Sequence, residues 1–244
     1  MSTVSDLIFK GGEHYLSSPF GKRKVLSTSA GKTSSFHSGA DYATHGVKLP
    51  QYSITDGTIL SCGTDYANAN ALFVWVAYPS LGVKMLHYHL DSISVKKGQT
   101  VKKGTQLGKT GKTGRSTGIH LHLGIKSISG GDWIDPEAWS KNEYPKLIKK
   151  NAEEKKAKYT TGNYKVTVAV LHVRSGAGIK HKNKLFNQLT KNAQQQILKL
   201  NGNKKADGYV KGMTFTASKI KEADGYTWGK TPSGWVALDY CKKV

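Results

Sequence analysis

The sequence predicts an all-β fold, in which an antiparallel β-sheet domain is followed by a smaller β-barrel. Between residues 54 and 128, short runs rich in β-branched and aromatic residues alternate with glycine turns, a pattern typical of strands joined by tight turns. The same pattern returns after residue 164. A chain of 244 residues is long enough for two domains of ordinary size.

The N-terminal part carries the clearest strand signals. Residues 71–78 and 83–90 are β-rich runs of strand length. Residues 95–107 repeat Val-Lys-Lys-Gly after six residues, which indicates successive turns of a folded sheet, because a solenoid needs a longer period. We therefore expect residues 1–140 to form the β-sheet domain.

The rest of the chain divides where the composition changes. Residues 141–161 are rich in Lys and Glu and nearly lack β-branched residues, which predicts a charged linker with a helical turn or two. Residues 162–244 are again rich in strand formers and predict a barrel of about 80 residues. Within it, residues 185–200 have partly helical spacing and predict a helix-like insertion.

Composition excludes several classes of protein. No run approaches the roughly 20 apolar residues of a membrane span, so no membrane insertion is expected. The first residues lack a basic segment followed by an apolar core, so no secretory signal is expected. Cys62 and Cys241 are too few and too far apart for a disulfide framework, and we expect two unpaired thiols.

The charge is strongly positive and unevenly distributed. The net charge is +21, and residues 162–244 alone carry 15 Lys or Arg against 4 Asp or Glu. Such a field draws a protein towards polyanions, among them nucleic acids, anionic membranes and the teichoic acids of a Gram-positive wall. The basic residues are scattered rather than grouped on a recognition element, so nucleic acid is not the expected partner.

Four residues in two short motifs offer metal ligands. His37 and Asp41 stand four apart in His-Ser-Gly-Ala-Asp, and His120 and His122 stand two apart in His-Leu-His. Side chains two apart on a strand share a face. His37 and Asp41 can converge on one ion only if the chain bends between them, which Gly39 permits. Imidazole and carboxylate are the ligand types of hydrolytic zinc, and three such ligands leave a position open for water.

A second histidine pair lies between these motifs. His87 and His89 flank Tyr88 on a predicted strand, so alternation places both imidazoles on one face. Either ring could reach a metal in principle. Spacing alone leaves the choice between them open.

Several motifs, in the same order along the chain, resemble those of the lysostaphin-type zinc endopeptidases. The resemblance covers about residues 15–140 and departs from the family pattern at Ile119, where a proline is usual. Its elements are Ser-Pro-Phe-Gly-Lys-Arg at 18–23, His-Ser-Gly-Ala-Asp-Tyr-Ala at 37–43, Asp-Gly-Thr-Ile at 56–59, Tyr-His-Leu-Asp-Ser at 88–92, the paired turns at 95–104, and Ser-Thr-Gly-Ile-His-Leu-His at 116–122.

The resemblance implies a function for each of these side chains. His37, Asp41 and His122 would bind Zn2+. His120 would act as the general base and His89 would polarise the carbonyl or stabilise the oxyanion, although these two roles are exchangeable. The motif aligns His89 rather than His87 with the active-site histidine. The implied reaction is hydrolysis of a peptide bond in the stem or cross-bridge of peptidoglycan.

The C-terminal part resembles bacterial SH3-like cell-wall-binding domains. The resemblance rests on Val-Arg-Ser-Gly-Ala-Gly at 173–178, where His172 replaces the usual Asn, on Gly-Tyr-Thr-Trp-Gly-Lys at 225–230 and on Ser-Gly-Trp-Val-Ala-Leu-Asp-Tyr at 233–240. It implies peptidoglycan as the partner, with anionic wall polymers such as teichoic acids as a further attraction. We expect the aromatic residues Trp228, Trp235 and Tyr240 to be barrel core rather than ligand contacts.

A peptidase domain joined to a wall-binding domain, without a signal peptide, resembles a bacteriophage endolysin. Such an enzyme would accumulate in the host cytoplasm and reach the wall through a holin lesion. A virion-associated hydrolase and a bacteriocin are alternatives for its role. The alternative in function is a non-catalytic wall-binding adaptor with a degenerate peptidase fold, although all five positions of the site are filled here.

Overall fold

The computed structural model describes residues 3–25, 27–28 and 31–244, and of residues 28 and 155–157 it describes the backbone alone. The chain divides into two compact units, Met1–Asn151 and Ala152–Val244, and the division falls inside the segment 141–161. The first two residues of the N-terminal segment, in which no signal was expected, lie outside the described part. Among the residues that are described, no helix is long and apolar enough to cross a membrane.

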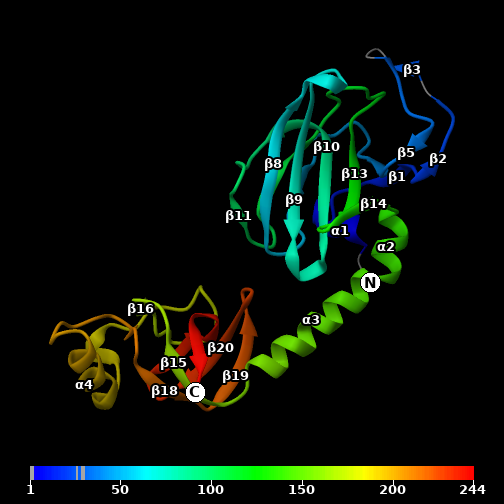
Figure 1. The fold of residues 1–244 in the computed structure, drawn as a ribbon. Helices are drawn as coiled ribbons and strands as arrows, with labels where there is room; N and C mark the ends of the chain where they lie inside the picture. The colour runs from blue at the N-terminus through cyan, green and yellow to red at the C-terminus, as the bar shows by residue number, and fades with distance from the viewer. Residues whose placement is uncertain (1–2, 26, 29–30) are drawn as a thin grey trace. The chain divides into compact units, whose positions relative to one another are not determined.

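Unit 1 is built mainly from antiparallel strands (Figure 1). Its elements are α1 (Val4–Phe9), β1 (Tyr15–Ser18), β2 (Gly21–Lys22), β3 (Ser27–Thr28), β4 (Gly31–Lys32), β5 (Phe36–His37), β6 (Ala40–Ala43), β7 (Pro50–Tyr52), β8 (Gly57–Asp65), η1 (Tyr66–Asn68), β9 (Ala71–Tyr78), η2 (Pro79–Leu81), β10 (Val83–Ile93), β11 (Thr100–Val101), β12 (Gln106–Thr110), β13 (His120–Ser127), β14 (Gly130–Ile134) and α2 (Pro136–Asn142). Helix α3 (Tyr144–Lys158) begins in unit 1 and ends in unit 2.

One ten-stranded sheet organises this unit. Its main path runs β1-β6-β13-β10-β9-β8-β11, while β12 pairs with both β10 and β7, and β14 pairs with β13. The long strand β10 is central, because β9 and β13 pair with its first part and β12 pairs with its last part. The strands expected at 71–78 and 83–90 are β9 and β10.

The two faces of the sheet differ in chemistry. On β13, Leu121, Leu123 and Ile125 are fully buried in the main core of unit 1. Because side chains alternate along a strand, the histidines of the same strand point to the opposite face. Helix α1 adds Ile8 and Phe9 to the core. The sheet therefore has one face packed in the core and one face that carries the histidines.

Unit 2 is a second, smaller set of short antiparallel strands. Two three-stranded sheets, β18-β15-β22 and β19-β20-β21, accompany the pair β16-β17. Its elements are β15 (Gly162–Val166), β16 (Val170–Leu171), η3 (Phe186–Gln188), α4 (Lys191–Leu200), β17 (Tyr209–Val210), β18 (Thr214–Ala217), β19 (Lys219–Ala223), β20 (Tyr226–Thr231), β21 (Gly234–Ala237), η4 (Leu238–Tyr240) and β22 (Cys241–Lys243). Both units are dominated by antiparallel strands, so the predicted all-β fold is confirmed.

The helix-like insertion of unit 2 is helix α4. The Thr190 side chain caps its N-terminus by accepting a hydrogen bond from the Ala193 amide. Ala193 and Ile197, four residues apart, are buried in the core of this unit. Strand β20 contributes Trp228, which is buried as expected, whereas Tyr240 is 40% exposed. The expectation of a core position is therefore wrong for Tyr240, which follows the last strand of the β19-β20-β21 sheet.

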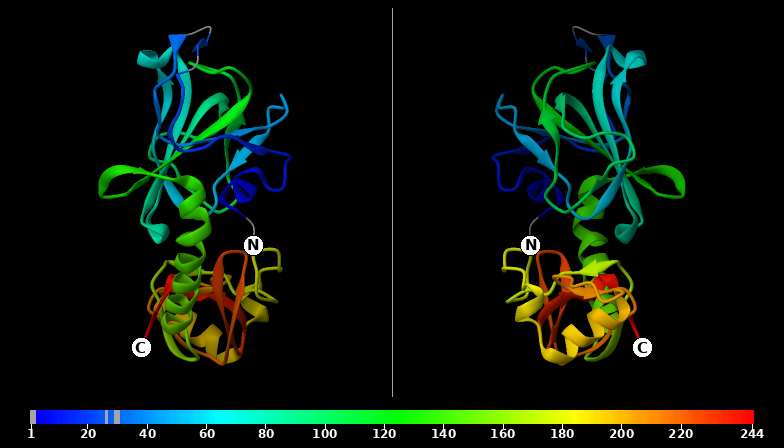
Figure 2. Two further views of the ribbon diagram at one scale, coloured as in Figure 1. Left: turned by 90° about the vertical axis from the view of Figure 1, so that its right-hand side faces the viewer. Right: turned by 90° about the vertical axis from the view of Figure 1, so that its left-hand side faces the viewer.

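The segment 141–161 is more helical than the sequence suggests. Helix α3 covers 15 residues and is the long green helix in Figure 1 and Figure 2. Lys, Glu and Ala are strong helix formers, and Lys146 pairs with Glu143 one turn earlier, with an N–O distance of 3.0 Å. The charged composition of this segment predicts a linker, although the same residues favour an exposed helix.

Candidate metal centre

Antiparallel pairing brings the two metal-ligand motifs together. Strand β6 pairs with β13 so that Asp41 lies directly opposite His122. His37 ends the short strand β5, and the bend through residues 38–39 returns the chain to β6. His120 lies on the same face of β13 as His122, as two-residue spacing predicts. Asp41 and His122, which are 81 positions apart in the sequence, thus become neighbours because of strand register.

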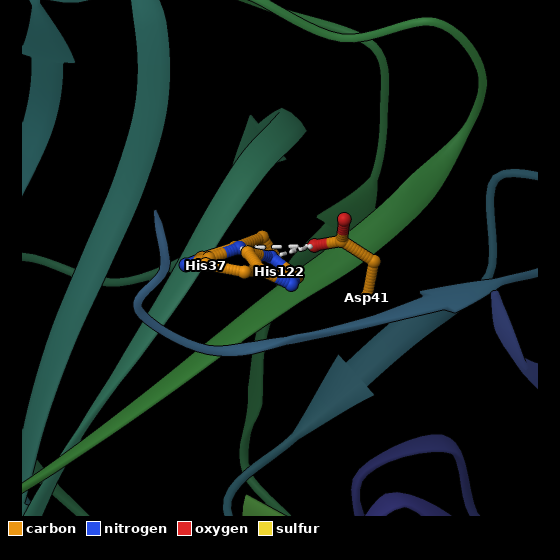
Figure 3. A group of neighbouring side chains, drawn as sticks. All are labelled: His37, Asp41 and His122. Atoms are coloured by element: carbon orange, nitrogen blue, oxygen red, sulfur yellow. Dashed lines mark hydrogen bonds and ion pairs between the residues drawn. The ribbon is translucent and has the colours of Figure 1, made fainter. Parts of the chain in front are cut away.

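Three side chains form a compact cluster of possible metal donors (Figure 3). His37 Nε2 lies 3.0 Å from Asp41 Oδ1 and 2.9 Å from His122 Nδ1, and His122 Nδ1 lies 2.9 Å from Asp41 Oδ1. The side chains of His37 and His122 are 2% and 11% exposed, and that of Asp41 is 14% exposed. The three donor atoms therefore face one point at the border of the buried interior.

The donor set fits zinc. Zinc binds imidazole nitrogen and carboxylate oxygen at about 2.0–2.2 Å, which places donors of a tetrahedral site about 3.3 Å apart. The three observed separations are slightly shorter, so binding requires outward shifts of only a few tenths of an ångström. Two imidazoles and one carboxylate leave a position for water, the arrangement of catalytic rather than structural zinc.

Protonation states agree with metal binding. Burial opposes the charged form of Asp41, but the adjacent rings of His122 and His37 outweigh this effect and hold the pKa of the carboxyl well below its usual range. Burial also lowers the pKa of His122, which favours the neutral ring. Carboxylates bind metals as anions and imidazoles bind as neutral rings.

A main-chain carbonyl orients His37 from behind. His37 Nδ1 lies 2.7 Å from the carbonyl oxygen of Pro19. Because a carbonyl can only accept a hydrogen bond, Nδ1 carries the proton and donates it. In the neutral ring Nε2 then presents its lone pair to the cluster, as in metal sites whose ligand histidines are held by outer hydrogen bonds.

Arg23 supports the carboxylate from the other side. Its Nη1 lies 3.5 Å from Asp41 Oδ2 and donates to Ser18 Oγ at 3.2 Å. Oδ2 is the oxygen of Asp41 that does not contact the histidines. The guanidinium therefore holds the carboxylate so that Oδ1 is directed at the cluster. Arg23 belongs to the Ser-Pro-Phe-Gly-Lys-Arg motif, and sequence reasoning assigned it no role.

Gly39 is required by the close approach of the 37–41 bend to β13. A Cβ atom at this position would lie 2.4 Å from the carbonyl oxygen of Leu123 and 2.8 Å from His122 Nε2. Neither neighbour is the flexible end of a side chain. Glycine is therefore required at the middle of His-Ser-Gly-Ala-Asp, because any side chain there would collide with β13 and with the ring of the proposed ligand His122.

We expect Gly39→Ala to weaken zinc binding at least tenfold and to destabilise the fold by about 1–3 kcal/mol, because the added methyl must push His122 and β13 away. Competition with a chromogenic chelator and thermal unfolding measure the two effects. Gly118→Ala is the matched control, since a Cβ there meets no atom within 4 Å. Equal zinc affinity in the two variants would contradict this account of Gly39.

His120 and His89 stand beside the cluster. His120 Nε2 lies 3.6 Å from Asp41 Oδ1, and the ring centroids of His89 and His120 are 4.8 Å apart. His120 Nδ1 donates to the carbonyl of Gly118 at 2.9 Å and His89 Nδ1 donates to that of Thr113 at 2.6 Å. Each neutral ring therefore directs an unprotonated Nε2 away from its carbonyl partner. All five residues named from the sequence lie in one place.

A β-bulge places His89 on this face. The pairing register of β10 shifts between Tyr88 and Leu90, and His89 has a φ of +61°, a left-handed conformation that is uncommon outside glycine. The extra residue reverses the alternation. Tyr88 and His89 consequently both contact His122, with ring centroids 6.1 and 6.0 Å away. Backbone strain of this kind is concentrated at functional sites.

The bulge corrects the expectation for His87. Alternation placed His87 on the same face as His89, but its register partners on β9 and β13 are the core residues Val74 and Leu123. His87 is fully buried, its Nδ1 lies 2.7 Å from Gln51 Oε1, and burial lowers its pKa to about 3. It is therefore a core histidine and not a candidate ligand.

A groove of about 700 Å³ opens from the cluster along the outer face of the sheet. His37, His89 and His122 line it together with Tyr88. The Tyr88 hydroxyl donates to Asp65 Oδ2 and accepts from Asn68 Nδ2, the latter at 2.9 Å. Sequence reasoning missed Tyr88 as a wall of the site, because only the bulge reveals which way it points.

The sequence of this region matches a known protein family. Residues 35–136 match peptidase family M23, and the three donors lie within the match. Unit 1 carries an M23 peptidase domain. The predicted family is therefore confirmed for this domain, and zinc binding by His37, Asp41 and His122 stays a prediction. Two imidazoles and one carboxylate also bind iron in some oxygenases, and the M23 match selects zinc.

Two relatives of the M23 domain are named as endopeptidases. Over 89 residues, the chain is 39% identical to the peptidoglycan DD-endopeptidase ShyB of Vibrio cholerae, covering 36% of this chain and 20% of that protein. Over 200 residues, it is 27% identical to the glycyl-glycine endopeptidase ALE-1 of Staphylococcus capitis, covering 79% of this chain and 50% of that protein. The chain thus spans a fifth to a half of the length of these curated relatives.

The M23 domain also has similar solved structures. One is the antimicrobial peptidase lysostaphin from Staphylococcus simulans, with a TM-score of 0.41 and 18% sequence identity. The alignment covers 93% of this chain and 88% of lysostaphin.

Proposed function

We propose that the protein is a zinc-dependent endopeptidase that hydrolyses a peptide bond in the stem or cross-bridge of peptidoglycan. The observation that carries this proposal is that the donor atoms of His37, Asp41 and His122 converge where the groove begins. The unprotonated nitrogens of His89 and His120 lie beside this cluster. The peptidoglycan DD-endopeptidase among the relatives of the M23 domain supports peptidoglycan as the substrate.

In this proposal His37, Asp41 and His122 hold zinc, which supplies a Lewis acid for the carbonyl and acidifies water when it is bound. His120 takes the proton of the attacking water at Nε2, because the Asp41 carboxylate 3.6 Å away stabilises the imidazolium that forms. The Gly118 carbonyl accepts the Nδ1 proton throughout and keeps the ring aligned. His120 then returns the proton to the leaving amine.

We assign His89 to orientation of the reacting groups. Its Nδ1 proton is directed at the Thr113 carbonyl, so in the neutral ring Nε2 can only accept a hydrogen bond. Burial lowers the pKa of His89 to about 3. A role in oxyanion stabilisation would need a proton on Nε2, and the geometry therefore favours His89 as an acceptor that positions water or a substrate N–H group.

We propose that unit 2 is an SH3-like domain that holds the enzyme on the wall. The excess of 15 basic over 4 acidic residues in 162–244 supports attraction to teichoic acids or other anionic polymers. Tethering raises the local concentration of an insoluble substrate without a new catalytic contact. As the biological setting we propose a bacteriophage endolysin that acts on the wall of a Gram-positive host, because a peptidase domain accompanies a strongly basic second unit.

The proposed function is tested by digestion of defined cell walls. We expect the purified protein to release muropeptides with new amino termini, identified by mass spectrometry, and to lose this activity when zinc is chelated. Readdition of stoichiometric zinc should restore it. Walls with glycine cross-bridges and walls with direct cross-links serve as the matched pair that identifies the bond. Protein that contains no zinc and releases no fragments from either wall would instead support the wall-binding adaptor.

A further inference from the structure

Aromatic side chains cover part of the groove that leads away from the metal donors. Phe73 and Trp75 on β9 and Trp133 on β14 line the same groove as His37 and His122. We call these three residues the aromatic platform. All three are partly exposed and pack on the outer face of the sheet. The platform is therefore continuous with the proposed active site.

Strand register fixes how near the platform is. Phe73 lies opposite Tyr88, which in turn lies opposite His122. Trp75 lies opposite Leu86, two residues further along β10. Two residues of a strand span about 7 Å. A ligand whose reacting group is at the metal donors therefore reaches the platform within one or two further chemical units.

The backbone of β13 is shaped to receive one indole. A Cβ atom at Gly124 would lie 2.6 Å from Trp133 Cζ3. Gly124 is two residues after His122, so it lies on the same face. The absence of a side chain there allows the Trp133 ring to lie against the strand. The Trp75 and Trp133 rings are 5.8 Å apart, with only 23° between their planes.

Lysine side chains lie over the rings of the two tryptophans. Lys84 Nζ lies 5.8 Å from the Trp75 ring centroid and Lys126 Nζ lies 4.6 Å from that of Trp133. The site therefore combines partly exposed aromatic rings with ammonium donors that lie over them. Such a surface suits a ligand with apolar faces and a polar perimeter.

A sugar ring meets this description better than a peptide does. The faces of a hexosamine ring present C–H bonds, which lose contact with water when they stack on an indole. Its hydroxyl, acetamido and ether oxygens point sideways, within reach of ammonium groups. A peptide lying flat on the platform would instead direct backbone N–H and C=O groups at rings that offer no partner.

We propose that the aromatic platform binds hexosamine rings of the glycan strand to which the scissile peptide is attached. The inference rests on the proposed peptidase function and deepens it, because it makes the glycan a determinant of specificity. The enzyme then recognises a glycopeptide substrate. The scissile carbonyl lies at the metal donors, and the sugar ring stacks on Trp75 and Trp133. Free peptides lack the second anchor and are poorer substrates.

The test compares two substrates with the same scissile peptide, one of which carries an amino-sugar disaccharide at its peptide amino terminus. We expect kcat/KM to be about tenfold higher for the glycopeptide, since stacking of this size corresponds to roughly one order of magnitude. Trp133→Ala and Trp75→Ala should bring the ratio close to one. Gly124→Ala should lower it as well, because the indole is displaced while being retained. Tyr15→Ala removes an exposed aromatic side chain outside the groove and should keep the wild-type ratio.

A binding measurement separates failure of this inference from failure of the proposed function. Titration with the disaccharide alone should change the tryptophan fluorescence of the wild type, and the change should disappear in Trp133→Ala. Binding without hydrolysis of either substrate would support the platform and reject the peptidase. Active enzyme with equal kcat/KM for both substrates, or a ratio insensitive to the tryptophan variants, overturns the inference. Absence of a Trp133-dependent fluorescence change overturns it independently of activity.

Discussion

Replacing His122 by alanine is expected to remove bound zinc and to lower peptidoglycan hydrolysis at least about a thousandfold, while the sheet remains folded. The imidazole supplies one of only three donors, and its Nδ1 is within 3.0 Å of both other donor atoms. The neighbouring core residues Leu121 and Leu123 are untouched by the change. Metal content by mass spectrometry, circular dichroism and release of wall fragments measure the three effects.

His45→Ala is the matched control for loss of a histidine. His45 is exposed and lies outside both the donor cluster and the groove in the described part of unit 1. This variant should keep its zinc and its activity. If His122→Ala retained either turnover or stoichiometric zinc, the assignment of the metal ligands would be wrong.

Replacing His120 by alanine should separate catalysis from metal binding. We expect kcat to fall by about 10²–10⁴, the usual contribution of a general base, with zinc content unchanged because the three donors are intact. Substrate binding along the groove should change little, so KM should move much less than kcat. Initial rates on a soluble glycopeptide, together with metal analysis of the same preparation, measure this division.

His120→Gln is the second variant, because glutamine keeps a polar side chain but offers no basic nitrogen. It should be as inactive as the alanine variant. If either variant kept more than a tenth of the wild-type kcat, His120 would not be the general base. His89, whose ring centroid is 4.8 Å from that of His120, would then be assigned this role.

The ligand cluster was predictable because its signals are local. Two-residue spacing places His120 and His122 on one face, and Gly39 between His37 and Asp41 indicates a bend. What spacing cannot provide is the register that sets Asp41 opposite His122. The ordered motifs of a known family supplied that information.

The remaining features depend on tertiary structure that a pattern of residues does not reveal. A one-residue bulge after Tyr88 turns His89 to the groove face, whereas His87 lies in the core. Simple alternation predicts instead that these two histidines share one face. Helix α3 arose from residues that equally suit a linker. Trp133 belongs to the groove only because Gly124 leaves room for its ring.

The carbonyl partner of His37 has a consequence for how the metal enters. This ligand ring is already held by the main chain of a folded segment, so its rotational freedom is lost during folding and not during metal capture. Apoprotein should therefore take up zinc quickly and with little structural rearrangement. The folded polypeptide therefore holds the ligands close to their binding geometry before the ion arrives.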